Sequence, residues 1–280
     1  MSKPLVRDTL KDLGLAASKS RGQNFLKDEK QIARVVATIL RGAGSRKIME
    51  IGPGLGALTR PLLEAGSEVN AVELDRGLAE NLAESLAVNY PGQLNVLHRD
   101  ILTIGKNDLS GLAPPLHLCG NLPYNISSPV LFWFLNLRSF FTGATFMLQK
   151  EMARRLNTEA GTKDYGRLTV ALSLWFRIKI ELDVPPSAFH PRPKVDSTVI
   201  SLSPRPEIEE PPIEPEALGR FTAAAFAARR KTIFNNLSRV YGRPQTEAAL
   251  SGLNLAPSLR AESLGPQTLA ALAVILENKE

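Results

Sequence analysis

Residues 47–56 read Lys-Ile-Met-Glu-Ile-Gly-Pro-Gly-Leu-Gly and decide the fold of this chain. The apolar run before Gly52 predicts a buried strand, and residues 57–65 predict a helix. Glycines between a strand and a helix allow a sharp turn and the close approach of a ligand to the backbone. We therefore expect a ligand to lie against Gly52 and Gly54. The loop alone leaves the ligand open, because Gly52, Gly54 and Ala57 also satisfy the dinucleotide-binding pattern G-x-G-x-x-G/A.

The alternation of short apolar strands with helices continues along most of the chain. Further helices are expected over residues 31–41, 77–89, 129–137, 150–156 and 167–176. Strands are expected over residues 47–51, 68–74, 94–97, 116–119, 144–148, 179–184 and 197–202. Strands that alternate with helices form a parallel sheet with helices on both faces. The sequence therefore predicts the α/β class.

A proline-rich segment is the best candidate for a domain boundary. A chain of 280 residues is typical of about two domains. Residues 204–215 contain five prolines and four glutamates, which is the composition of a stiff, polar linker. We expect one domain over residues 1–203 and a small helical domain over residues 216–280.

The net charge of +6 is distributed unevenly along the chain. Residues 1–206 carry 26 basic and 19 acidic side chains, whereas residues 207–280 carry 8 and 9. A basic N-terminal part suits a polyanionic partner such as nucleic acid. An ordinary solvated surface is the alternative.

The composition also bears on the compartment and on metal binding. The single cysteine, Cys119, excludes an intrachain disulfide and favours a reducing compartment. There is no signal-peptide pattern and no stretch of ~18 apolar residues, so we expect a cytoplasmic protein without membrane contact. His98, His117 and His190 show no metal-ligand spacing, so no metal is expected.

Acidic side chains mark the ends of three neighbouring predicted strands. Glu50 lies just before the glycine loop, Glu73 ends the second strand, and Asp100 follows the third. Ligands of open α/β sheets bind at the carboxyl ends of strands, so we expect these carboxylates to share one site. Glu73 is expected to accept hydrogen bonds from two ribose hydroxyls, Asp100 to meet an adenine amino group, and Glu50 to reach a cationic methionine group. The set favours S-adenosylmethionine over NAD as the cofactor.

The sequence Asn121-Leu122-Pro123-Tyr124 follows the fourth strand at the same edge of the sheet. An exocyclic amine of a nucleobase is a poor nucleophile, because its lone pair is delocalised into the ring. Hydrogen bonds to the side-chain carbonyl of Asn121 and the backbone carbonyl of Leu122 would free that lone pair for attack on a methyl group. Pro123 fixes the turn, and Tyr124 offers a flat face on which the base can stack. We expect methyl transfer that depends on positioning and electrostatics.

Several ordered motifs together resemble the ribosomal RNA adenine N6,N6-dimethyltransferase family, over about residues 20–237. Besides the glycine loop and the Asn-Leu-Pro-Tyr sequence, they occupy residues 22–26, 72–75, 149–151, 189–197 and 229–232. The resemblance implies a Rossmann-like class I methyltransferase fold with a seven-stranded, mostly parallel sheet. It also implies an S-adenosylmethionine-binding catalytic domain and a small helical C-terminal domain that binds RNA.

The resemblance also implies particular site residues. The residues expected to bind S-adenosylmethionine are Asn24, Leu26, Gly52, Gly54, Glu73, Asp100 and Asn121. The first two imply that the basic N-terminal arm, residues 3–30, folds over the cofactor. Asn121 and Tyr124 are expected to hold the target adenine, and Phe189 to pack on its other face.

The C-terminal part is expected to contact RNA phosphates through Arg229, Arg230 and Lys231. Two positions depart from the family's pattern. Arg99 stands where Gly is common, and Phe234 stands where Arg is common, which puts one phosphate contact in doubt.

The resemblance implies dimethylation of the N6 amines of two adjacent adenines in the 3′-terminal hairpin loop of small-subunit (16S) rRNA. The expected protein is a monomer that acts on this rRNA, or on an immature 30S subunit, during ribosome biogenesis. Three alternatives stay open: a ribosome-assembly factor with incidental catalysis, a large-subunit rRNA or DNA adenine methyltransferase, and an NAD dehydrogenase. The Arg-Arg-Lys-Thr sequence at residues 229–232 argues against the second, and the third rests on the glycine loop alone.

Overall fold

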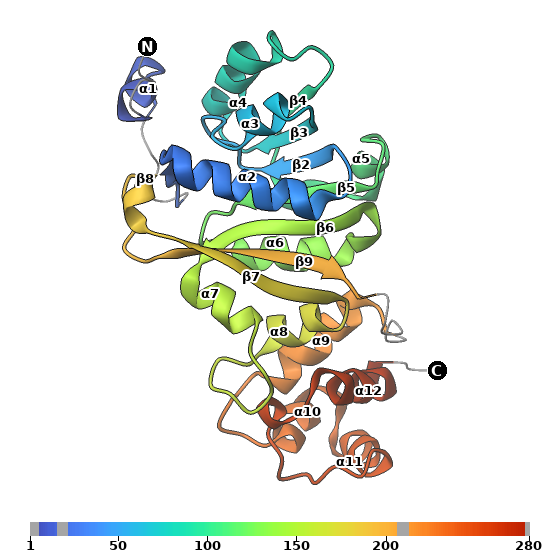
Figure 1. Ribbon diagram of the computed structural model, residues 1–280. Coiled ribbons are helices and arrows are strands. Elements are labelled where there is room, and N and C mark those ends of the chain that lie inside the picture. Colours follow the sequence, from blue (N-terminus) through green and yellow to red (C-terminus); the bar gives the residue numbers. More distant parts are fainter. Residues whose placement is uncertain (1–5, 16–21, 206–212, 278–280) are drawn as a thin grey trace. The chain divides into compact units, whose positions relative to one another are not determined.

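The computed structural model describes residues 6–15, 22–205 and 213–277 (Figure 1). The chain divides into two compact units. The first comprises Met1–Ala153 and Lys179–Ser203, and the second comprises Arg154–Ile178 and Pro204–Glu280.

The division of the chain differs from the expected one at a single segment. The boundary between the two units after Ser203 coincides with the start of the expected proline-rich linker. Residues 206–212 of that linker lie outside the described residues. Arg154–Ile178 groups with the C-terminal helices instead of the sheet. The reason is packing: helix α8 (Arg167–Ser173) contacts α9 (Pro215–Ala225).

The first unit is built on a seven-stranded sheet, as the resemblance implied. The strand order is β4-β3-β2-β5-β6-β9-β7. The strands are β2 (Lys47–Ile51), β3 (Glu68–Glu73), β4 (Leu94–His98), β5 (Leu116–Asn121), β6 (Phe141–Gln149), β7 (Phe176–Val184) and β9 (Ser197–Pro204). Neighbours from β4 to β6 pair in parallel, and β9 pairs antiparallel to β6. The carboxyl ends of β2, β3, β4 and β5 therefore meet at one edge.

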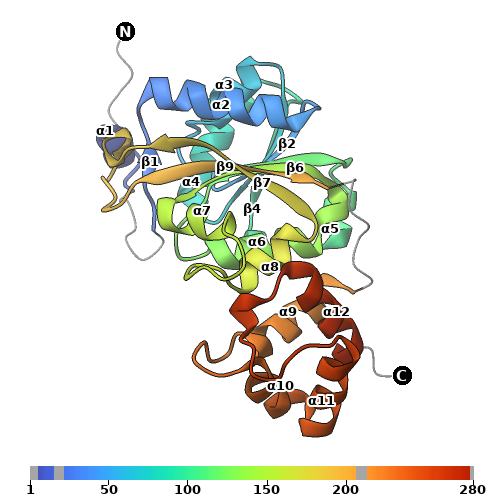
Figure 2. The ribbon, with the colours of Figure 1, turned by 60° about the horizontal axis from the view of Figure 1, so that its bottom comes forward.

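Helices cover both faces of this sheet. The helices along this part of the chain are α1 (Val6–Asp12), α2 (Glu29–Ala43), α3 (Thr59–Glu64), α4 (Arg76–Leu82), α5 (Lys106–Ser110), α6 (Ser127–Asn136) and α7 (Lys150–Leu156). Figures 1 and 2 show α2 and α6 on opposite faces of the sheet. Helix α2 is amphipathic, and its buried face includes Val35 and Ile39, which join Ile48 of the sheet in the core. Its ends are set by Asp28, which accepts a hydrogen bond from the N–H of Gln31, and by a left-handed Gly44.

The structure corrects some of the predicted boundaries. The helix expected over residues 57–65 begins at Thr59, because residues 54–58 form a turn in which Gly56 has φ +79°. The helix expected over residues 167–176 ends at Ser173, because Phe176 already begins β7. Helix α4 continues as one π-helical segment, Ala83–Ala87.

A second, two-stranded sheet was not predicted. Strand β1 (Phe25–Leu26) pairs antiparallel with β8 (Phe189–His190). Two-residue strands leave no periodic signal in a sequence, so only the tertiary structure shows the pairing. The pairing joins the N-terminal arm to the loop that precedes β9.

The interior accounts for two residues whose chemistry was open in the sequence. The His117 ring is buried and its Nε2 lies 2.9 Å from the Thr145 hydroxyl, while burial lowers its pKa to about 4. Cys119 is buried beside it in the same strand. Both residues therefore belong to the packing of the sheet.

The second unit is helical in its C-terminal part, as expected. After α9 it contains α10 (Ile233–Tyr241), α11 (Arg243–Gly252) and α12 (Pro266–Glu277). The buried Tyr165 donates a hydrogen bond to the Leu264 carbonyl at 3.0 Å. This contact joins the segment Arg154–Ile178 to the residues just before α12. Among all the described residues, no helix is long and apolar enough to cross a membrane.

Gly120 stands where β5 passes close to β2, and it provides a test of this strand spacing. A Cβ atom at Gly120 would lie 2.5 Å from the carbonyl oxygen of Ile51, which is backbone and cannot move aside alone. We expect Gly120→Ala to lower the free energy of unfolding by about 1–3 kcal/mol, measured by urea denaturation. Gly219→Ala in α9 is the control, since open space surrounds that position, and it should not destabilise the protein. Equal stability of Gly120→Ala and wild type would contradict this account.

Candidate active site

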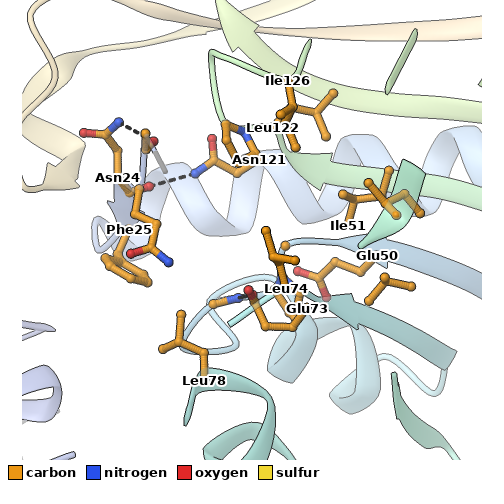
Figure 3. Close-up of a pocket in the computed structure, with 18 of the residues that line it drawn as sticks. Asn24, Phe25, Glu50, Ile51, Glu73, Leu74, Leu78, Asn121, Leu122 and Ile126 are labelled. Carbon is orange, nitrogen blue, oxygen red and sulfur yellow. Dashed lines mark hydrogen bonds between the residues drawn. The ribbon is translucent and has the colours of Figure 1, made fainter. Parts of the chain in front are cut away.

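A pocket in the first unit lies at the shared edge formed by the carboxyl ends of β2, β3, β4 and β5 (Figure 3). The glycine loop, the Asn-Leu-Pro-Tyr turn and the N-terminal arm form its walls. Ten predicted site residues line it: Asn24, Leu26, Gly52, Gly54, Glu73, Asp100, Asn121, Leu122, Pro123 and Tyr124. The fold thus brings together residues that are far apart in the sequence.

The carboxylate of Glu73 holds the glycine loop in place. Its Oε2 accepts the backbone N–H of Gly54 at 3.0 Å, and its Oε1 accepts the N–H of Asp75 at 2.9 Å. Burial raises the pKa of Glu73, and the two backbone hydrogen bonds oppose that rise. Each carboxylate oxygen has two lone pairs, so both oxygens keep capacity for a ligand hydroxyl. The ribose contact stays a prediction, and the loop contact is one that the sequence did not reveal.

The glycine loop needs its glycines for two different reasons. Gly52 has φ +63° and Gly54 has φ +57°, a region that side chains with a Cβ rarely adopt. A Cβ at Gly54 would also lie 3.0 Å from the ring of Phe25, which belongs to β1. The aromatic ring of the N-terminal arm therefore packs directly on the loop.

Glu50 is deeply buried beside the pocket. Its side chain accepts a hydrogen bond from the Thr59 hydroxyl at 2.7 Å and is 1% exposed. Burial raises its pKa to about 7, with a smaller contribution from the charge of Glu73, while the Thr59 hydrogen bond acts in the opposite direction. Sequence analysis placed Glu50 at this edge but did not anticipate Thr59 as its partner.

Asp100 also lines the pocket and follows β4 in the chain. Its Oδ1 accepts the N–H of Leu102 at 2.9 Å and caps the 3-10 turn Ile101–Thr103. The pocket wall near Glu73 and Asp100 includes the apolar side chains of Leu74 and Leu78. A flat apolar ring with a polar edge fits this combination of groups.

The side-chain amide of Asn121 is held in one orientation by the N-terminal arm. Its Nδ2 donates to the backbone carbonyl of Asn24 at 2.9 Å, and Figure 3 shows the two residues facing each other. The arm lies close to the turn here, since a Cβ at Gly22 would be 3.2 Å from Oδ1 of Asn125. Because Nδ2 is engaged, the Oδ1 end of Asn121 is the end that can accept a hydrogen bond from a ligand.

Two other strands hold the rest of the turn. The N–H of Leu122 donates to the Met147 carbonyl of β6 at 3.1 Å, so the backbone carbonyl of Leu122 belongs to a fixed peptide segment. The Tyr124 hydroxyl lies 3.1 Å from the Ser197 hydroxyl of β9, and burial raises the pKa of Tyr124. The ring of Tyr124 is therefore anchored at its far end while it lines the pocket.

The side chains at the end of the Asn-Leu-Pro-Tyr turn do not cap helix α6. The Ser127 hydroxyl donates to the Pro123 carbonyl at 3.1 Å, instead of accepting a hydrogen bond from the start of α6. The residue at the N-cap position, Ile126, makes no side-chain cap hydrogen bond. The turn is thus held by its contacts with β6, β9 and the arm.

Phe189 is a predicted catalytic residue that is not among the described residues that line the pocket. It is 2% exposed, packs in the core and pairs with Leu26 across the small sheet. This position does not bring Phe189 to a base, and its stacking role stays a prediction.

The predicted phosphate-binding residues belong to the second unit. Arg229 makes an ion pair with Glu262, with Nε 3.3 Å from Oε2. Arg230 and Lys231 are exposed, and they precede Thr232, which caps α10 through the N–H of Asn235. In the parts of the chain that the structure describes, no group of three His, Cys, Asp or Glu side chains could hold a metal ion.

The sheet order, the glycine loop and the acidic strand ends define the class: a Rossmann-like α/β protein of the methyltransferase type. Solved structures share this fold. A dimethyladenosine transferase from Plasmodium falciparum matches with a TM-score of 0.70 at 22% identity and covers 89% of this chain and 95% of its own. The 23S rRNA methyltransferase ErmE matches with a TM-score of 0.61 at 32% identity and covers 91% of this chain and 100% of its own.

The family follows from the sequence as a whole. Residues 14–275 match the ribosomal RNA adenine dimethylase family, and the chain belongs to that family. The ribosomal RNA small subunit methyltransferase A of Thiobacillus denitrificans is 42% identical over 259 residues, covering 92% of this chain and 97% of its own. The protein of the same name from Laribacter hongkongensis is 45% identical over 219 residues, covering 77% of this chain and 80% of its own. The family predicted from the motifs is thereby confirmed.

Glu50 makes the stability of the ligand-free protein depend on pH. The folded protein holds this proton up to about pH 7, whereas an ordinary glutamate loses it near 4.5, so folding binds the proton more tightly. The free energy of unfolding should therefore fall, by about 3 kcal/mol in all, as pH rises from 4.5 to 7. Glu50→Gln keeps an acceptor for Thr59 and removes this titration, so its stability should fall by about 3 kcal/mol less over the same pH range. Urea denaturation at several pH values measures the difference, and parallel pH profiles would disprove the assignment.

Proposed function

We propose that this protein transfers methyl groups from S-adenosylmethionine to the N6 amines of two adjacent adenines in the 3′-terminal hairpin loop of small-subunit rRNA. Its membership of the ribosomal RNA adenine dimethylase family supports the reaction class. Relatives named for the small subunit, at about 40% identity, support the choice of RNA. The observation that carries the proposal is the fixed amide of Asn121 at the edge of the pocket.

The pocket fits S-adenosylmethionine by its set of polar and apolar groups. The buried Glu73 carboxylate keeps lone pairs for ribose hydroxyls, and Asp100 stands beside apolar side chains where an adenine ring would lie. Glu50 lines the other side, and its ionised form would favour the positive charge of the methionine part. Leu26 and Phe25 of the arm would cover the cofactor from outside.

When bound, S-adenosylmethionine supplies a methyl group on a positively charged sulfur, which makes that carbon electrophilic. The residues of this chain prepare the acceptor. Oδ1 of Asn121 and the carbonyl of Leu122 accept the two N6 hydrogens of the adenine, and this draws the lone pair out of the ring. Tyr124 stacks on the base, and its hydroxyl contact with Ser197 keeps the ring from turning. Catalysis then comes from orientation and from fixed dipoles, and the amine releases its proton to water after transfer.

An unstacked adenine is required, because an amine inside a duplex cannot reach the pocket. Extracting a base costs a few kcal/mol, least where the base is already unpaired, as in a hairpin loop. A second methyl transfer to the same nitrogen must accommodate a monomethylated amine. The resulting product is N6,N6-dimethyladenosine.

The first experiment uses labelled S-adenosylmethionine and unmethylated small ribosomal subunits. Nuclease digestion and mass spectrometry then identify the modified nucleosides and their positions. Dimethyladenosine at two adjacent loop adenines is the expected result. No label in that rRNA, with the protein still bound to the subunit, would refute the enzymatic proposal and favour an assembly factor.

A second candidate is methylation of large-subunit rRNA. It is favoured by one observation, the 32% identity to the 23S rRNA methyltransferase ErmE over most of both chains. Incubation with large subunits under the same conditions separates the candidates. Label in the large-subunit rRNA only would replace the small-subunit proposal.

Asn121 provides the sharpest test of the chemistry. We expect Asn121→Asp to lower kcat by about 100-fold or more, because a fixed dipole at the reacting group contributes about 3 kcal/mol to catalysis. Asn121→Asp keeps the size of the side chain but places a carboxylate beside the Asn24 carbonyl. Ser110→Ala, at the exposed end of α5, is the control. Turnover of Asn121→Asp within about threefold of wild type would contradict the proposed role.

Arg230 and Lys231 test the RNA contact of the second unit. Each neutralised phosphate steepens the slope of log affinity against log salt by about 0.7–0.9, so Arg230→Ala and Lys231→Ala should each make that slope shallower by about this amount. Arg229→Ala should have a smaller effect, because its guanidinium already pairs with Glu262. Filter binding of rRNA at several salt concentrations measures the slopes. Unchanged slopes in both variants would exclude these two phosphate contacts.

A further inference from the structure

Arg99 and Asp100 are consecutive residues, and both line the same end of the pocket. Asp100 is the carboxylate proposed above to meet the adenine amino group of the cofactor. A guanidinium presents several N–H donors in a fork that matches a carboxylate. The guanidinium of Arg99 would therefore compete with the adenine amino group for the carboxylate of Asp100, unless another group holds Arg99.

A second carboxylate holds Arg99. The guanidinium Nη1 of Arg99 donates to Oδ1 of Asp108 at 2.6 Å, and its Nη2 donates to the Thr103 carbonyl at 3.3 Å. Asp108 lies in α5 and is itself fixed, since its Oδ2 accepts the N–H of Gly105 at 2.9 Å. The Gly105 hydrogen bond and then Arg99 lower the pKa of Asp108, which keeps it ionised.

The same loop fixes Asp100 from its own side. Its Oδ1 accepts the N–H of Leu102, and its backbone carbonyl accepts the Thr103 hydroxyl at 2.8 Å. Neither contact uses Arg99. The two acidic residues thus have separate tasks within one short segment: Asp108 takes the guanidinium, and Asp100 caps the turn and faces the pocket.

We propose that Asp108 is a positioning residue that sequesters Arg99 and thereby keeps the carboxylate of Asp100 available to the adenine amino group of the cofactor. The inference rests on the proposed use of S-adenosylmethionine. Without Asp108, the guanidinium of Arg99 turns to Asp100 and occupies its free lone pairs. A released Arg99 also adds a positive charge at the mouth of a pocket that receives a cationic cofactor.

The ion pair between Arg99 and Asp108 is exposed, so its effect on cofactor binding can be measured apart from its effect on stability. The side chains of Arg99 and Asp108 are 43% and 40% exposed. Exposed ion pairs contribute little to folding. Substitutions here should therefore leave the fold intact while the affinity for the cofactor changes.

The test is calorimetric titration of the full-length protein with S-adenosylmethionine. Asp108→Asn keeps an oxygen that can accept the Gly105 N–H but removes the charge that holds Arg99. We expect Asp108→Asn to raise Kd by about three- to fivefold, the scale of an exposed charge pair. Arg99→Ala is the reference for Arg99→Ala with Asp108→Asn: these two variants should have equal Kd, because Asp108 has no guanidinium to sequester once Arg99 is gone.

A matched control is available on α4. Glu80 pairs with Arg76, with Nε and Oε1 2.7 Å apart, and neither residue lines the pocket. Glu80→Gln changes the net charge by the same amount as Asp108→Asn and should leave Kd unchanged. At about 1 M salt, where the screening length is ~3 Å, the loss in Asp108→Asn should shrink.

The outcomes separate the explanations. If Asp108→Asn binds weakly and the double variant binds equally weakly, Asp108 acts through the structure of α5, and the sequestration proposal is overturned. Wild-type affinity in Asp108→Asn overturns it as well. A wild-type protein that does not bind S-adenosylmethionine at all would refute the proposed function, and this inference with it.

Discussion

The buried carboxylate of Glu73 is the contact on which the pocket depends. It stands at the end of β3 and accepts one N–H from the loop after β2 and one from the start of the next segment. A buried carboxylate without partners would be costly, and hydrogen bonds to a charged group contribute about 1.5–3 kcal/mol each. The loop and the carboxylate therefore fix each other. The floor of the pocket is formed before any ligand arrives.

The N-terminal arm has structural contacts besides its proposed role in covering the cofactor. It packs the ring of Phe25 on Gly54 and presents the carbonyl of Asn24 to the amide of Asn121. It also pairs with β8 and so reaches the loop that bears Phe189. One short segment thus touches the cofactor side and the proposed base side of the pocket. The orientation of the Asn121 amide therefore depends on the position of Asn24 in the arm.

The three acidic side chains of the pocket differ in how deeply they are buried. Glu50 is fully buried with a pKa raised to about 7, Glu73 is buried but hydrogen-bonded, and Asp100 is partly open to solvent. A cationic ligand would favour the ionised form of the most buried carboxyl group. The proton on Glu50 is therefore exchanged for the charge of the ligand in the proposed complex. Thr59 assists, since its hydroxyl hydrogen bond favours the charged carboxylate.

Local rules sufficed to predict the strand-loop-helix unit, the parallel sheet and the acidic strand ends: apolar periodicity, glycine at turns and polar residues at strand ends. The family, and with it the pocket residues Asn24 and Leu26, followed instead from the resemblance of several ordered motifs. The tertiary structure alone decided the partner of Asn121, the pairing of β1 with β8, the core position of Phe189 and the grouping of Arg154–Ile178 with the C-terminal helices. Each of these depends on contacts between segments far apart in the chain. Such contacts leave no periodic trace in the sequence, because they are set by which surfaces the folded backbone brings together.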